Sequence, residues 1–181
     1  ALTTRRSASK LSDPEPPEDV LEACLEAAIS APDHGRLRPW RFILVRGEGR
    51  QRLGRAMAEA LAARDAGATE AMMERERAKP LRAPLIVVAV AKVDPEHEKI
   101  PEIEQVLAAG AATENFLVAL HAADFGGMWR TGPAAYDATV KVALGLAADD
   151  HIIGFLYVGT IEVGPGPAVE QNLQDYVSEW S

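Results

Sequence analysis

The stretch LIVVAVAK, residues 85–92, decides the fold. It is rich in β-branched residues and lacks the alternation of polar and apolar residues that marks a strand with one wet face. Such a run predicts a central strand that is buried on both faces. A second run, IIGFLYVGT at residues 152–160, has the same character and predicts another buried strand.

The surrounding sequence predicts further strands and helices. A third strand is expected at Trp40–Val45, and Met128–Arg130 is expected to be short and extended. An apolar face with a 3.6-residue period predicts a helix at residues 18–30. Further helices are expected near residues 50–64, 69–79, 102–124 and 137–144.

The 181 residues predict one domain, 1–181, in which residues 163–181 form a tail with too few apolar residues to fold alone. This tail either packs along the body or reaches a partner subunit. Cys24 is the single cysteine, so no disulfide can form within the chain. We expect Cys24 to be a core thiol, and the absence of a disulfide suits the cytoplasm.

Charge is unevenly distributed within a net charge of −8. Residues 1–55 hold ten Lys/Arg and eight Asp/Glu, whereas residues 83–181 hold four and fourteen. The acidic C-terminal half argues against nucleic acid as a partner. The longest apolar run, Leu85–Ala91, is too short to span a bilayer, so no membrane partner is expected.

Three short segments carry candidate chemistry. Arg5-Arg6-Ser7 could bind a phosphate through charge-assisted hydrogen bonds, or could be a solvated basic terminus. The segment APDHGRLRPWRF, residues 31–42, concentrates His34, Arg36 and Arg38 around a Pro-Trp pair. It could be an anion site or an ordinary polar turn.

The third segment is GGMWRTG, residues 126–132. Its glycines permit close approach to a flat ligand, and Trp129 brings a large apolar plane. Arg130 is an isolated cation that either pairs with a carboxylate or awaits an anion; the alternative is a core Trp beside a salt-bridged Arg. The sequence contains no HExxH, GxSxG, CxxC or P-loop, so no metal site and no protein nucleophile is expected. An organic cofactor is favoured instead.

Taken in order, RRSASK, APDHGRLRPWRF, GGMWRTG and the closing run resemble the nitroreductase-like FMN flavoproteins, in particular the short bacterial members. The resemblance implies an α+β fold with a mixed, mainly antiparallel sheet flanked by helices. It also implies an intertwined homodimer with FMN at the interface and a C-terminal extension that embraces the partner.

The resemblance assigns the residues that bind the cofactor. Arg5, Arg6 and Ser7 are expected at the FMN phosphate and ribityl chain, and His34 against the flavin of the other subunit. The ring is expected to be lined by Trp129, Arg130 and Thr131. The family's Asn and Gln in the second segment are Arg36 and Arg38 here, and Arg38 is a candidate for attracting an anionic substrate.

The implied activity is reduction of nitroaromatics, quinones or related conjugated acceptors by a ping-pong mechanism. FMN would be tightly bound and would carry the chemistry, with NADH or NADPH as co-substrate and no side chain as catalyst. The alternative is a non-catalytic flavin carrier or sensor on the same fold. The physiological acceptor and the choice between NADH and NADPH stay open.

Overall fold

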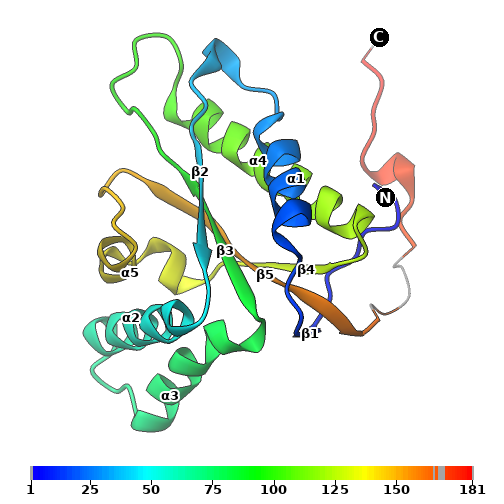
Figure 1. Ribbon diagram of the computed structural model, residues 1–181. Coiled ribbons are helices and arrows are strands. Elements are labelled where there is room, and N and C mark those ends of the chain that lie inside the picture. Colours follow the sequence, from blue (N-terminus) through cyan, green and yellow to red (C-terminus); the bar gives the residue numbers. More distant parts are fainter. Residues whose placement is uncertain (1, 165, 167–169, 181) are drawn as a thin grey trace.

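The two aliphatic runs lie side by side in one five-stranded sheet (Figure 1). The protein is described by a computed structural model of residues 2–164, 166 and 170–180. The strands are β1 (Lys10–Ser12), β2 (Trp40–Val45), β3 (Leu85–Ala91), β4 (Gly126–Arg130) and β5 (His151–Val163). Their order is β1-β5-β3-β2, and β4 also pairs with β5. Every pair of strands in the described part of the chain is antiparallel.

Helices cover both faces of the sheet. The α-helices are α1 (Glu18–Ile29), α2 (Glu48–Arg64), α3 (Glu70–Ala78), α4 (Glu102–Ala122) and α5 (Ala138–Ala143). Helices α1 and α4 pack on one face, whereas α2 and α5 pack on the other, with α3 against α2 (Figure 1). Short 3-10 turns occur at His34–Arg36, Lys79–Arg82, Pro133–Tyr136 and Leu173–Asp175. None of the described helices combines the length and apolar character of a membrane span.

Alternation along β3 explains why its sequence is apolar throughout. Ile86, Val88 and Val90 point into the core beneath α2 and α5, and the intervening residues point into the core beneath α1 and α4. Each residue of β3 is at most 1% exposed. Cys24 lies in the α1/α4 core, as expected, and burial raises the pKa of its thiol.

One local expectation is corrected. Residues 11–17, expected to be a polar link, begin with part of β1, which pairs Leu11 with Ile161 of β5. Gly126 and Gly127 follow the end of α4 and are part of β4, and their approach to a flat ligand stays a prediction. A Cβ at Gly126 would lie 2.4 Å from Leu11 Cδ2, so this glycine is required by internal packing.

The described part of the tail does not pack on the body. Every described residue from Glu162 to Trp180 is exposed, including the large apolar side chains Leu173, Tyr176 and Trp180. Residues 165, 167–169 and 181 of the expected tail lie outside the described residues. The tail was expected either to pack along the body or to reach a partner subunit. The described residues of the tail do not pack along the body.

Candidate functional site

A cavity of about 310 Å³ lies at the end of β4, on the face of the sheet that carries α2 and α5. Phe155 and Tyr157 of β5 line it, together with Thr131 and Gly132, which follow β4. Its charged lining consists of Arg64, Glu76, Lys79, Arg82 and Arg130. Cations therefore outnumber anions four to one in this lining, within a protein whose net charge is −8.

Two of these cations are free of carboxylates. Lys79 Nζ pairs with Glu76 at 2.5 Å, and Arg64 lies 3.8 Å from Asp137. Among the residues that the structure describes, Arg82 and Arg130 form no ion pair; Arg130 Nε donates only to Met128 Sδ, at 3.0 Å. Two unpaired guanidinium groups that share a cavity are suited to an anionic ligand.

Tyr157 is the buried polar group beside these cations. Its pKa is raised above the ordinary tyrosine value, chiefly because burial disfavours the phenolate. The positive charges of Arg130 and Arg82 act in the opposite direction. The phenol therefore stays protonated at neutral pH and can donate a hydrogen bond into the cavity.

Strand alternation separates Trp129 from Arg130. The Trp129 indole packs in the α1/α4 core, and its Nε1–H donates to the Ile153 carbonyl at 3.0 Å. A Cβ on Gly154 would lie 2.2 Å from that nitrogen, so the ring lies directly over this glycine. The indole therefore faces away from the cavity, and any contact of Trp129 with a ligand there is restricted to its backbone. Its role in binding the cofactor stays a prediction.

The N-terminal segment reaches the same edge of the sheet. The Ala8 amide donates to the Gly127 carbonyl at 3.2 Å, which ties the segment to β4. A narrow gap beside Ala8 and Ser9 is also lined by Arg82 and Arg130. The chain that follows the first sequence segment thus lies beside the third segment.

Arg5 and Arg6 lie on the α4 side of this edge. Arg5 Nε donates to Glu114 Oε1 at 3.1 Å, and Arg6 donates to the backbone carbonyls of Thr3 and Arg5. Both arginines line a small cavity of about 50 Å³, and Ser7 is exposed next to them. Arg6 has no carboxylate partner within the described chain, so its charge is available to a ligand.

His34 and Arg38 are not at this edge. They lie in the loop before β2, at the opposite end of the sheet from β1 (Figure 1). His34 pairs with Glu104, whereas Arg5 pairs with Glu114, ten residues or about 15 Å further along α4. The side chains of His34 and Arg38 are exposed. One copy of the chain therefore does not unite His34 with Arg130; a second copy could.

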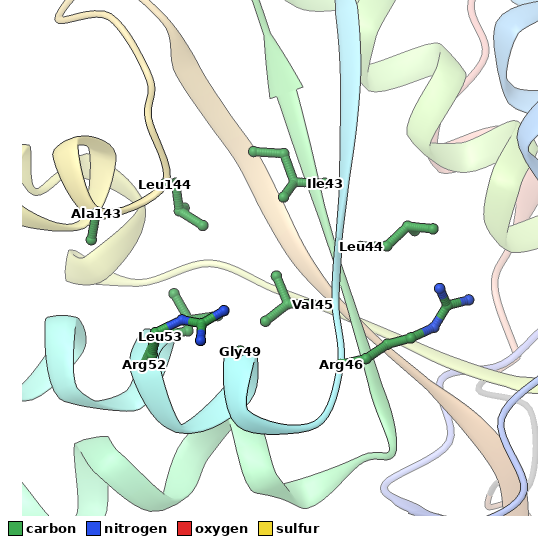
Figure 2. A pocket seen from close by; sticks show the side chains of 9 residues that line it. All are labelled: Ile43, Leu44, Val45, Arg46, Gly49, Arg52, Leu53, Ala143 and Leu144. Carbon is green, nitrogen blue, oxygen red and sulfur yellow. The ribbon is translucent and has the colours of Figure 1, made fainter.

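A larger cavity, of about 530 Å³, lies elsewhere, between β2, α2 and α5 (Figure 2). Figure 2 shows Ile43 and Val45 directed towards Leu53 and Leu144, whereas Arg46 points to the other side of β2. Arg52 is the one charged side chain on the cavity side of the strand. The cavity thus offers apolar surface but no group of titratable or nucleophilic side chains, and the basic cavity is the better candidate.

Sequence reasoning missed Arg82 and Tyr157. Arg82 lies in the 3-10 turn before β3, and Tyr157 is the one phenol in the apolar run of β5. The register places Tyr157 opposite Met128 of β4 and Ile86 of β3, so only the assembled sheet brings it beside Arg130. The one local signal in the sequence was the tyrosine itself, a polar side chain within an otherwise apolar strand.

The residues present fit a planar anionic cofactor such as FMN. Unpaired guanidinium groups of Arg82 and Arg130 suit an electron-rich ring that gains negative charge, and Arg5, Arg6 and Ser7 supply donors for a phosphate. No group of three or more metal-ligating side chains occurs in the described ranges.

The antiparallel sheet between two helical layers is the nitroreductase-like α+β fold. The nitroreductase-like family protein from Bacillus cereus superposes with a TM-score of 0.84 over 99% of this chain and 93% of its own, at 24% identity. A Desulfovibrio desulfuricans protein, described as a "putative nitroreductase in complex with fmn", has a TM-score of 0.72 at 25% identity, covering 99% and 94%.

The chain belongs to the nitroreductase family, whose sequence model matches residues 2–160. Two relatives carry the name "Putative NAD(P)H nitroreductase". YdjA of Escherichia coli K12 is 40% identical over 159 residues, and the Haemophilus influenzae protein is 36% identical over 159 residues. Each alignment covers 88% of this chain and 85% of the relative. The resemblance inferred from the sequence and the expected fold class are thus confirmed.

Proposed function

We propose that the protein is an FMN-dependent oxidoreductase that uses NAD(P)H to reduce nitroaromatics, quinones or related conjugated acceptors by a ping-pong mechanism. The observation that carries this proposal is the pair of unpaired guanidiniums, Arg82 and Arg130, which line a cavity and also a gap beside Ala8 and Ser9, the residues that follow Arg5-Arg6-Ser7. The names of the two relatives and the FMN complex of the D. desulfuricans protein support it. When bound, FMN would supply the redox chemistry that connects NAD(P)H to the acceptor.

The protein's contribution is to bind and orient. Arg5, Arg6 and Ser7 hold the phosphate and ribityl chain through charge-assisted hydrogen bonds. Arg130 and Thr131 line the ring, and the Arg130 charge stabilises negative charge that develops there. No side chain needs to act as a nucleophile or metal ligand.

The complete site is formed by a homodimer, with His34 and Arg38 supplied by the other copy. Helix α4 supports this proposal because Ile103 and Leu107, one turn apart, are 61% and 64% exposed. They lie on the side of α4 that is opposite to its buried side, and the half-buried Val118 continues this apolar stripe further along the helix. An exposed apolar stripe on a central helix is typical of an interface.

Residues 163–181 form the extension of a single FMN-binding domain and embrace the partner. The exposed Tyr176, Val177 and Trp180 support this role, because their apolar surface is unburied in one copy of the chain. Cys24, buried and reduced, suits a cytoplasmic protein.

One spectrum tests the proposal. The purified protein is expected to be yellow, with the absorbance of oxidised flavin, and to bleach when NADPH or NADH is added without oxygen. A yellow protein that neither nucleotide bleaches is a flavin carrier or sensor. A colourless protein that binds no added FMN overturns the proposal.

A further inference from the structure

The loop between α1 and β2 has an unusual backbone. Gly35, Arg36 and Arg38 have φ angles of +72°, +57° and +51°, in the left-handed region. Residues with a Cβ seldom adopt this region, and positions that do so cluster at functional sites. The side chains of His34, Arg36 and Arg38 are exposed, so an unusual backbone and outward-facing polar side chains occur together in this loop.

The body of the protein holds this shape at two points. The Asp33 carboxylate accepts the Arg38 amide hydrogen bond at 2.5 Å and closes the loop. Gly35 packs directly on Ile100, where a Cβ would come within 2.1 Å of Cδ1. The Ile100 carbonyl in turn accepts from Gln105 Nε2 at 3.1 Å, and Gln105 is buried. The backbone of the loop is therefore fixed independently of the His34 side chain.

A third contact acts on the imidazole itself. His34 Nδ1 lies 2.5 Å from Glu104 Oε2, in the first turn of α4. A carboxylate accepts but does not donate, so this contact requires a proton on Nδ1. In the neutral ring the proton is then absent from Nε2, which becomes an acceptor. The His34 side chain is 69% exposed, and Nε2 lies on the side of the ring away from Glu104.

We propose that Glu104 is a positioning residue: it fixes the Nδ1–H tautomer of His34 and directs Nε2 outwards to the cofactor site of a second copy. This inference rests on the proposed function, in which His34 contacts the partner's flavin. The new element is Glu104. This residue decides that Nε2 of His34 meets the cofactor and that this nitrogen accepts a hydrogen bond.

The chain contains a matched control. Two residues earlier on α4, Glu102 Oε1 lies 2.7 Å from His151 Nε2 at the start of β5. Glu102→Gln therefore alters a second surface histidine–carboxylate pair in the same helical turn, without touching the loop. An amide in place of either carboxylate can both donate and accept, so it no longer selects a tautomer.

The experiment compares the full-length wild type, Glu104→Gln and Glu102→Gln. The imidazole nitrogens are labelled with ¹⁵N, His34 is assigned from the resonances lost in His34→Asn, and spectra are recorded at pH 9, a pH that favours neutral imidazole in general. The FMN dissociation constant of each protein is measured by quenching of flavin fluorescence. Thermal unfolding verifies that each variant is folded.

We expect the Nδ1–H tautomer of His34 in the wild type and in Glu102→Gln, and a mixture in Glu104→Gln. Glu104→Gln should also weaken FMN binding by about 1.5- to 5-fold, the range of a partly exposed histidine–carboxylate contact, with no change in Glu102→Gln. The inference is overturned if Glu104→Gln keeps either the wild-type tautomer or the wild-type FMN affinity. A wild type that binds no FMN contradicts the proposed function instead, so the two failures are distinguishable.

Discussion

Arg5 of the N-terminal segment is held by Glu114 of α4, with Nε donating to Oε1 at 3.1 Å. The guanidinium expected to bind the cofactor phosphate thus already has an anionic neighbour, and the Glu114 side chain is half exposed. A carboxylate at this distance orients the arginine, but it also repels a phosphate that approaches the same group.

Substitutions of Arg5 and of Glu114 are therefore expected to change FMN affinity in opposite directions. Arg5→Ala should weaken FMN binding by about 10-fold or more, because a hydrogen bond to a charged group contributes about 1.5–3 kcal/mol. Glu114→Gln should strengthen binding by about 1.5- to 5-fold, since an exposed ion pair contributes about 0.2–1 kcal/mol. Flavin fluorescence titration measures both. Weaker binding in Glu114→Gln would show that orientation of Arg5 outweighs the repulsion.

Arg130 is predicted to raise the reduction potential of the bound flavin. Its guanidinium has no carboxylate partner within the described residues, so its charge is available to stabilise the electron-rich reduced ring. Arg130→Gln should therefore make the midpoint potential more negative, by about 30 mV for each tenfold loss of relative affinity for the reduced form. Anaerobic redox titration measures this shift.

The matched control for Arg130 is Arg75→Gln. Arg75 is an exposed arginine of α3 that does not line the cavity. The potential of this variant should equal that of the wild type. An unchanged or more positive potential in Arg130→Gln would remove the proposed role of Arg130.

Most of the sheet could be predicted because its strands are strongly apolar. Leu85–Ala91 is buried whatever its neighbours are, so its composition alone indicates its place. Lys10–Ser12 has no such signal, since three residues with one apolar side chain become a strand only by pairing with β5. Alternation along β4 could have separated Trp129 from Arg130, but the sequence does not show which side faces a cavity.

The candidate site was only partly predictable, for a related reason. Arg5, Arg6 and Arg130 stand in local motifs, so the sequence alone makes them candidates. Arg82 and Tyr157 join them through the registers of β3 and β4 on β5, which depend on tertiary structure. The separation of His34 from Arg130 likewise depends on which ends of the strands meet.

The exposed stripe on α4 predicts that dimerisation and FMN binding are coupled. Leu107→Glu places a charge at the centre of the stripe, and we expect it to shift the protein to monomers and to lower FMN affinity. Val142→Glu, at an exposed aliphatic position of α5 on the opposite face of the sheet, is the control. Sedimentation velocity and flavin titration measure the two properties. A Leu107→Glu variant that keeps the wild-type mass and FMN affinity would exclude this stripe as the interface.

Tyr157 predicts a loss of stability at alkaline pH. Burial raises its pKa in the folded protein above the ordinary value of about 10, so the unfolded chain releases this proton first. Between the unfolded and the folded pKa the folded state binds more protons, and the free energy of unfolding therefore falls as pH rises. Tyr157→Phe should remove this part of the decline. Urea unfolding between pH 9 and pH 11 measures the slope, and equal slopes in the two proteins would contradict the burial argument.

The same residue reports on the cavity charges. Arg82 and Arg130 favour the phenolate of Tyr157, so removing either positive charge should raise its pKa further. The phenolate absorbance of each arginine variant is titrated, and the matching titration in the Tyr157→Phe background is subtracted to remove the other two tyrosines. We expect Arg82→Gln and Arg130→Gln to shift the Tyr157 midpoint upwards, and Arg75→Gln to leave it in place. An unchanged or lower midpoint in either cavity variant would mean that its guanidinium does not stabilise the phenolate, and the proposed cationic wall of the site would lose that member.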